Sequence, residues 1–172
     1  MPTKTKAKRS AAAVKAGKTR RRKSAGKKAA LTKRSGTAAM TPLKVVQKGY
    51  GYFAKGDIEG VLSVYADNAK FTPQMGLEGK TPLVTPKGTF SKSEMGGFFG
   101  TLAQELEFKQ WENRQWVVDG KTVIVLGYYA GNNKRTGKPF KSEFCHVLTV
   151  ERGKVTSFKE FTDTAAALEA AR

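Results

Sequence analysis

The chain has 172 residues with 32 Lys or Arg, 14 Asp or Glu, one His and one Cys, and a formal net charge of +18. The single cysteine excludes a disulfide within the chain, and one His with one Cys argues against a structural zinc site. No apolar run approaches the roughly 20 residues that span a bilayer, and the N-terminus lacks the apolar stretch of a secretory signal. We therefore expect a protein of a reducing intracellular compartment, nucleus or cytoplasm by preference, with no metal, no cofactor and no membrane span.

The positive charge is concentrated at the N-terminus. Residues 1–40 hold 14 Lys or Arg and no acidic residue, whereas residues 41–172 hold 18 basic and 14 acidic residues. A segment with so few large apolar side chains cannot offset the entropy cost of ordering its backbone. The sequence thus predicts a disordered Lys/Arg/Ala-rich tail, residues 1–40, and a folded domain, residues 41–172.

The basic tail has several interpretations. It can bind a polyanion, such as nucleic acid or an acidic protein, by placing basic side chains against phosphates and releasing counterions. Residues 20–23 also suit a nuclear-import signal, and the acid-free composition with Ser and Thr suits organelle import. A solvated tail that aids solubility is the plainest alternative. We favour the polyanion-binding arm, with the candidate contacts Arg20, Arg21, Arg22, Lys23, Lys27 and Lys28.

Helices are predicted in the first half of the folded domain. Thr41 and Pro42 suit the cap and the first residue of a helix, whose apolar residues recur at helical spacing. Residues 58–65 predict a second, shorter helix, and the capping box at residues 91–94 begins a third. A short strand is expected at residues 69–73, followed by a long irregular connection.

Long strands are predicted in the second half. Residues 105–118 and 122–130 flank an Asp-Gly turn, and residues 138–163 form a hairpin that turns at residues 151–154. Asp163 can cap a last short helix. Three helices followed by four long antiparallel strands indicate an α+β domain with its helices on one face of a curved sheet.

Three sequence motifs resemble the SnoaL-like branch of the NTF2-like superfamily. They are FAKGDIEGV at residues 53–61, YADNAKF at residues 65–71, and the closing hairpin at residues 140–163. The resemblance covers about residues 42–165 and implies a cone-shaped α+β barrel that encloses a pocket. This fold hosts isomerases, cyclases, hydrolases, transport factors and scaffolds, so it does not define an activity.

The resemblance also implies which face of the hairpin lines the pocket. Period-two alternation separates the odd-numbered residues 143–147 from the even-numbered residues 144–148. The resemblance directs the odd-numbered face inward and makes the even-numbered face an association surface for a homodimer. The predicted pocket residues are Tyr50, Phe53, Phe98, Trp116, Cys145, Val147 and Phe158, with Phe99 as the alternative to Phe98 and Trp111 as the alternative to Trp116. The predicted interface residues are Phe144, His146 and Leu148.

Catalysis by a ketosteroid-isomerase mechanism is not supported. That relative of the fold uses an Asp base with Tyr and protonated Asp donors. The corresponding positions here carry Pro73, Gly49 and Cys145. Glu143 and Glu160 offer another route: facing each other in a dry pocket, like charges would raise one pKa and give an acid and a base. The alternative is that each carboxylate pairs with a Lys or Arg at the rim.

Three functions stay open on the sequence alone. The leading prediction is a binding or adaptor module whose cationic tail tethers it to nucleic acid or another acidic partner. The first alternative is a small-molecule isomerase or cyclase that uses Glu143 and Glu160. The second is a dimeric scaffold without a ligand.

Overall fold

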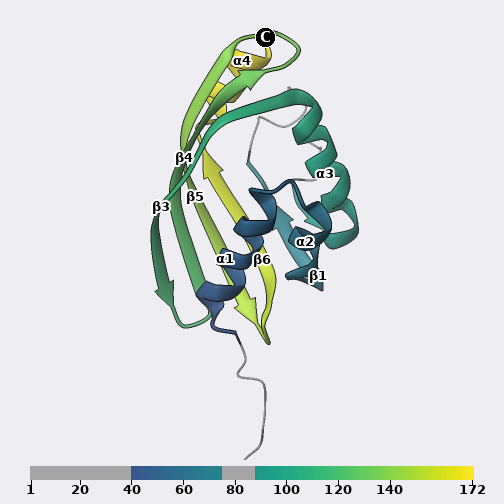
Figure 1. Ribbon diagram of the computed structural model, residues 1–172, viewed down its shortest axis with the longest axis vertical. Helices are drawn as coiled ribbons and strands as arrows, with labels where there is room; N and C mark the ends of the chain where they lie inside the picture. The colour runs from purple at the N-terminus through teal and green to yellow at the C-terminus, as the bar shows by residue number, and fades with distance from the viewer. Residues whose placement is uncertain (1–39, 75–87) are drawn as a thin grey trace, which may run out of the picture. The chain divides into compact units, whose positions relative to one another are not determined.

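The computed structural model describes residues 40–74 and 88–172, so residues 1–39 of the predicted basic tail lie outside the described residues. The described part is an α+β domain, as predicted (Figure 1). Its elements, in chain order, are α1 (Pro42–Phe53), α2 (Ile58–Ser63), β1 (Tyr65–Thr72), β2 (Phe90–Ser91), α3 (Lys92–Glu105), β3 (Leu106–Asp119), β4 (Thr122–Asn133), β5 (Pro139–Glu151), β6 (Lys154–Thr162) and α4 (Thr164–Ala171).

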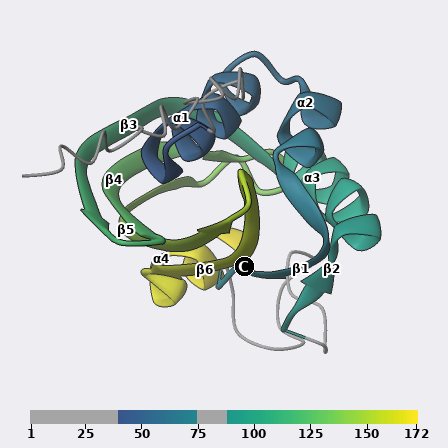
Figure 2. The ribbon, with the colours of Figure 1, turned by 90° about the horizontal axis from the view of Figure 1, so that it is seen from below.

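The strands form one curved sheet in the order β2-β1-β6-β5-β4-β3 (Figure 2). All neighbouring pairs are antiparallel except β1 and β6, which are parallel. The sequence predicted the four long antiparallel strands but not this parallel pair. Strand β1 begins at Tyr65, inside the stretch predicted as helical, because Tyr65 pairs with Val155 and the Val64 carbonyl accepts from Val155 N at 2.9 Å. Tertiary pairing thus overrides the helical spacing of the residues before it.

Local capping explains where the helices begin. Thr41 Oγ1 accepts from Lys44 N at 3.4 Å, and the Glu94 carboxylate accepts from Ser91 N at 2.7 Å. Asp163 Oδ1 accepts from Ala166 N at 3.0 Å, which confirms the predicted cap of the last helix. Each cap satisfies a backbone N–H that has no partner within its own helix.

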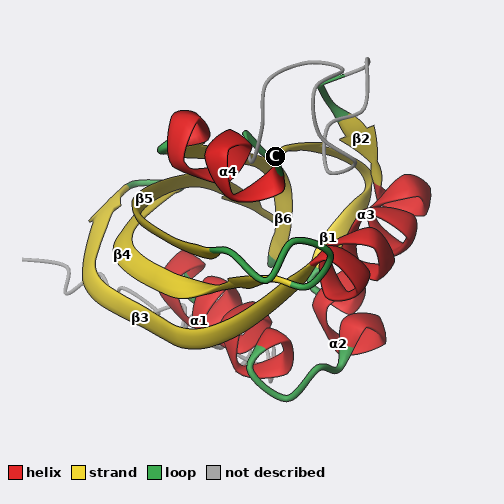
Figure 3. Ribbon diagram, turned by 90° about the horizontal axis from the view of Figure 1, so that it is seen from above, coloured by secondary structure: helices red, strands yellow, loops and turns green. Residues whose placement is uncertain are grey.

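Helices α1, α2 and α3 lie on one side of the sheet and cover its concave face (Figures 1 and 3). Val46 of α1, Met95 of α3, and Val123 and Val125 of β4 are fully buried members of one apolar core. In the described part of the chain no helix is both long enough and apolar enough to cross a membrane. The concave face of the sheet and the three helices thus share one apolar core.

The loop between β4 and β5 holds the ends of two helices. Lys134 Nζ donates to the Ala103 carbonyl near the end of α3 at 2.6 Å. Thr136 Oγ1 donates to the Ala170 carbonyl of α4 at 2.6 Å, and the Arg135 guanidinium donates to the Ala171 carbonyl. Cationic side chains at these positions also complement the negative end of a helix dipole.

Candidate functional site

A cavity lies between the concave face of the sheet and helices α1, α2 and α3. It offers about 80 Å³ to the centres of water-sized molecules. A sphere of that volume, widened by the roughly 1.4 Å radius of water, is about 8 Å across, the size of a one- or two-ring compound. Its walls are mostly apolar and aromatic: Val46, Gly49, Tyr50, Phe53, Val61, Val64, Tyr65, Phe71, Pro73, Phe98, Phe99, Leu102, Trp111, His146, Leu148, Val155, Phe158 and Glu160.

Two ionisable side chains from neighbouring strands enter this apolar wall. His146 of β5 is paired directly with Glu160 of β6, and on its other side with Val125 of β4. Directly opposed residues of antiparallel strands share one face of the sheet, so both side chains point inward. His146 is 4% exposed and Glu160 is 3% exposed. Burial of such groups is costly unless they are hydrogen-bonded, and here they are bonded to each other.

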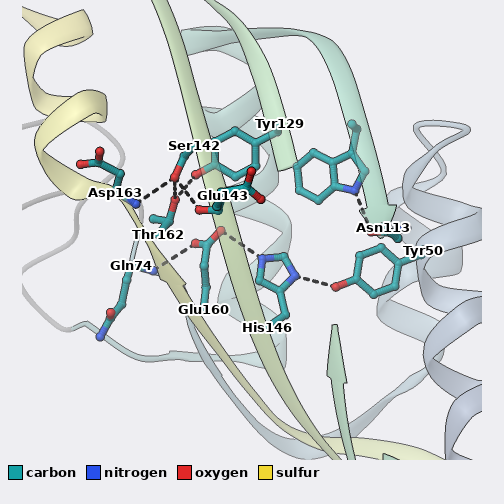
Figure 4. A network of polar contacts seen from close by, with 11 residues as sticks. Tyr50, Gln74, Asn113, Tyr129, Ser142, Glu143, His146, Glu160, Thr162 and Asp163 are labelled. Atoms are coloured by element: carbon teal, nitrogen blue, oxygen red, sulfur yellow. Dashed lines mark hydrogen bonds and ion pairs between the residues drawn. The ribbon is translucent and has the colours of Figure 1, made fainter. Parts of the chain in front are cut away.

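A chain of hydrogen bonds runs from Tyr50 of α1 through His146 to Glu160 (Figure 4). Tyr50 Oη lies 2.5 Å from His146 Nδ1, and His146 Nε2 lies 3.2 Å from Glu160 Oε1. The second carboxylate oxygen, Glu160 Oε2, accepts from Gln74 N at 3.1 Å. An ionised carboxylate can only accept, so in a neutral imidazole the proton lies on Nε2 and Nδ1 accepts from the Tyr50 hydroxyl.

Aromatic packing fixes the orientation of the imidazole ring. The Phe144 ring stacks on it with a centroid distance of 4.2 Å, and the Phe158 ring meets it edge-on at 4.8 Å. Gly127, opposite Phe144 on β4, leaves the space that this ring occupies. A Cβ at Gly127 would lie 2.2 Å from Phe144 Cζ and 2.3 Å from the Glu112 carbonyl oxygen. Gly127 therefore leaves room for the Phe144 ring, which in turn packs against the imidazole ring of His146.

The Tyr50 hydroxyl is held in its protonated form. Burial raises the pKa of Tyr50 well above its usual value, and the nearby Tyr65, Glu160 and Cys145 groups add to this effect. A neutral phenol can donate to Nδ1 while its oxygen lone pairs stay available to a ligand. Tyr50 is therefore the end of the hydrogen-bond chain that can meet a molecule in the cavity.

A second polar network lies further along β5 and β6, outside the cavity (Figure 4). The Tyr129 hydroxyl is hydrogen-bonded to the Thr162 hydroxyl, with 2.5 Å between Oη and Oγ1. Ser142 Oγ lies 2.8 Å from the same Thr162 oxygen. Asp163 N donates to Ser142 Oγ at 2.9 Å. These bonds anchor the start of α4 to the sheet, and we assign the network a structural role.

The inward and outward faces of β5 are the reverse of the prediction. Cys145 and Val147 lie on the outer face, while Phe144, His146 and Leu148 are buried inside and cannot form an association surface. Glu143 is also outward, with a side chain that is 70% exposed and paired with Arg114 at 2.8 Å. The predicted Glu143–Glu160 pair does not exist, and the rim ion pair that was its alternative is what Glu143 forms.

A bulge in the hairpin explains this error. Val150 pairs with Val155, but the next pair is Thr149 with Ser157, so Thr156 is an extra residue in β6. Without it, Cys145 would lie opposite Glu160 and would share its face. A one-residue shift moves every following side chain to the other face of the sheet. The sequence carries no clear signal for an extra residue at this position.

The other predicted pocket residues lie near the cavity. Tyr50, Phe53, Phe98 and Phe158 line it, as does Glu160. Trp116 does not line it but meets the Tyr50 ring edge-on, with a centroid distance of 5.3 Å. Trp111, the predicted alternative to Trp116, is part of the wall, and so is Tyr65, which was not predicted. The proposed polyanion contacts at residues 20–28 lie outside the described residues.

The described residues offer no obvious metal site. No group of three or more His, Cys, Asp or Glu side chains in residues 40–74 and 88–172 is arranged to hold an ion. What the cavity presents instead is an aromatic wall with one Tyr–His–Glu hydrogen-bond chain. This arrangement can bind an apolar ring system and exchange a proton with it.

Comparison with known proteins agrees with this architecture. An NTF2-like protein from Burkholderia thailandensis is 28% identical, and the match covers 77% of this chain and 98% of that one with a TM-score of 0.68. An NTF2-like protein from Burkholderia xenovorans is 25% identical, and the match covers 80% of this chain and 100% of that one with a TM-score of 0.68. The crystal structure of TerC co-crystallised with polyporic acid is 26% identical and covers 76% of this chain and 98% of that one, at a TM-score of 0.66. A search of curated proteins finds no match. The model of the SnoaL-like domain matches residues 46–158, more than half of the chain, and the protein therefore belongs to the SnoaL-like domain family.

Proposed function

We propose that this protein binds a small aromatic molecule in its cavity and catalyses a proton transfer on it, through the chain Tyr50–His146–Glu160. The observation that carries the proposal is the placement of this chain, buried and fully hydrogen-bonded, in a wall that is otherwise apolar. An apolar pocket with a few convergent polar groups is the usual form of a small-molecule site. The open cavity also argues against a scaffold whose pocket is filled by its own side chains.

In the proposed mechanism, Tyr50 meets the ligand and His146 receives the proton. Both imidazole nitrogens are engaged, so a ligand reaches the chain through the phenol oxygen. A proton leaving a ligand C–H adds to Tyr50 Oη while the phenol proton passes to His146 Nδ1. The ligand is left as an enolate, and the imidazolium is paired with Glu160. Because the two transfers occur together, the unfavourable buried phenolate implied by the raised pKa of Tyr50 does not accumulate.

Return of the proton to a different ligand atom would be an isomerisation. Attack of the enolate carbon on a carbonyl of the same ligand would close a ring. Both reactions need only a proton shuttle in a dry, shaped cavity, and neither needs a group that this chain does not supply. The polyporic acid complex of TerC, a related structure, supports an aromatic ligand for this cavity.

Deuterium exchange tests the proposal without knowledge of the natural substrate. β-Tetralone, a two-ring aromatic ketone, has exchangeable protons next to its carbonyl, and NMR in D2O follows their replacement. We expect the protein to accelerate exchange, and Tyr50→Phe and His146→Gln to lose on the order of a hundredfold or more of that acceleration. The matched control is Tyr128→Phe, which removes a phenol hydroxyl from the outer face, where Arg114 covers the ring.

The outcomes separate clearly. Exchange that is no faster than in buffer would reject proton transfer, and acceleration that survives in both Tyr50→Phe and His146→Gln would reject the assigned residues. Circular dichroism and thermal unfolding show whether each variant is folded.

A homodimer through the outer face of the sheet is a separate proposal. Leu126, Cys145 and Phe161 lie directly opposite one another on β4, β5 and β6, and Leu126 and Phe161 are exposed. Adjacent exposed apolar side chains are typical of contact surfaces. Sedimentation velocity at micromolar concentration tests it, and a single monomeric species would reject it.

The basic tail supports a third proposal, that residues 1–40 tether the domain to nucleic acid or an acidic partner. It rests on composition, since 14 basic and no acidic residues lie in this segment. Deletion of residues 1–40 should abolish binding to a nucleic acid at low salt, because the electrostatic contacts are lost. Unchanged binding by the truncated protein would reject this role.

A further inference from the structure

A second phenol, Tyr65, lies in the cavity wall and is not part of the hydrogen-bond chain. It begins β1, and its backbone is fixed by pairing with Val155 of β6. Its side chain is 5% exposed, and its ring meets Phe71 edge-on with a centroid distance of 6.3 Å. The position of the ring is therefore set by the core and does not depend on any bond to its hydroxyl.

The Tyr65 hydroxyl has no hydrogen-bond partner among the described residues. By contrast, the Tyr50 hydroxyl is bonded to His146, and that of Tyr129 to Thr162. Buried phenol hydroxyls usually find a partner, so an unpaired one calls for an explanation. Within residues 40–74 and 88–172, the one side-chain polar atom that is both sealed from open space and unpaired is Glu105 Oε2. The Tyr65 hydroxyl is therefore in contact with open space, and the cavity is the space that its side chain lines.

This hydroxyl is a hydrogen-bond donor. Burial raises the pKa of Tyr65 above its usual value, so the phenol stays neutral at physiological pH. Tyr50 and Tyr65 both line the cavity. A ligand in the cavity thus meets two phenols, of which Tyr50 already donates to His146 and Tyr65 has its donor free.

We infer that Tyr65 determines specificity by donating a hydrogen bond to a ligand carbonyl oxygen, so that the cavity selects one- or two-ring aromatic carbonyl compounds over aromatic hydrocarbons. This inference rests on the proposed function, since it takes the cavity to be a ligand site. The remaining wall is apolar and aromatic and suits the ring system. A site that hydrogen-bonds an oxygen rejects an analogue without it, because the buried donor is then left unpaired.

A matched pair of probes tests the inference. β-Tetralone and tetralin share one two-ring skeleton and differ in the carbonyl group. We measure their dissociation constants by ligand-observed NMR for the wild-type protein, Tyr65→Phe and the outer-face control Tyr128→Phe. One hydrogen bond corresponds to a preference of about threefold to tenfold. We expect the wild type and Tyr128→Phe to prefer β-tetralone by this factor, and Tyr65→Phe to bind both compounds equally and tetralin as tightly as the wild type does.

The two proposals fail in different ways. If the wild type binds both compounds with equal affinity, or if Tyr65→Phe retains the preference, the role of Tyr65 is overturned and the cavity remains a ligand site. If the wild type binds neither compound, the proposed function fails and the role of Tyr65 falls with it. Equal thermal unfolding of Tyr65→Phe and the wild type shows that a lost preference does not arise from a disturbed fold.

Discussion

Replacing Glu160 by Gln should reverse the direction of the hydrogen-bond chain. The carboxylate accepts twice, from His146 Nε2 and from Gln74 N. A Gln side chain has one accepting oxygen and one donating NH₂ group. If the oxygen keeps the bond from Gln74 N, the NH₂ group faces Nε2, which must then accept. The imidazole proton moves to Nδ1, and the Tyr50 hydroxyl must accept where it donated before.

The magnitude follows from the same bonds. The Tyr50–His146 bond and the bond from His146 to residue 160 both survive with donor and acceptor exchanged. The loss in the free energy of unfolding should therefore stay at about 1–3 kcal/mol, the range for one poorly satisfied buried group. The effect on proton transfer should be larger, because Nδ1 is no longer a free acceptor for the Tyr50 proton. Exchange of β-tetralone should therefore fall on the order of a hundredfold while the protein stays folded.

Nitrogen-15 NMR gives a direct assay. His146 is the one histidine in the sequence, so its ring signals need no assignment. Protonated and unprotonated ring nitrogens differ widely in chemical shift, and coupling to the ring protons tells Nδ1 from Nε2. We expect the proton on Nε2 in the wild type and on Nδ1 in Glu160→Gln. A wild type with its proton on Nδ1, or a variant with the same tautomer as the wild type, would refute the reasoning.

Three further predictions concern stability and assembly. Burial raises the pKa of Tyr65 above its ordinary value of 10.0, so the contribution of its neutral phenol to stability is complete below about pH 10 and falls as the pH rises further. In urea unfolding, the free energy of unfolding should therefore fall less above pH 10 for Tyr65→Phe than for the wild type. The difference should be up to about 1.4 kcal/mol per pH unit. In thermal unfolding, Gly127→Ala should destabilise the protein by about 1–3 kcal/mol, because the added Cβ clashes with Phe144. The control Gly100→Ala in α3, where the added Cβ meets open space, should be neutral or stabilising. Equal effects of the two substitutions would contradict the packing argument. Phe161→Glu on the outer face should shift a dimer to monomer in sedimentation velocity, and an unchanged dimer would place its contact elsewhere.

Local sequence signals predicted the elements of this fold well. The caps at Thr41 and Asp163 are made by the side chains that the sequence indicated. The long strands follow from period-two alternation, and the family resemblance supplied their arrangement. The parallel pairing of β1 with β6 was not predicted, because it depends on contacts between segments far apart in the chain.

The site was predicted less well than the fold. Glu160 was identified as a cavity residue, but its partner was taken to be Glu143 and not His146. The error lies in one residue, Thr156, whose insertion into β6 changes which face of β5 shares the cavity. Alternation in a strand defines two faces, and only the pairing between strands decides which one is buried. Both faces of β5 carry apolar residues, so composition could not decide between them.

The loop between β4 and β5 has a practical consequence for how this protein is handled. Lys134, Arg135 and Thr136 follow one another in the chain, and they hold α3, which contributes to the cavity wall, and α4, which ends the chain. An affinity tag or fusion partner joined after Arg172 would lie next to the same short loop that also contacts the end of α3. Ligand-binding measurements on this protein are therefore best made with its C-terminus unmodified.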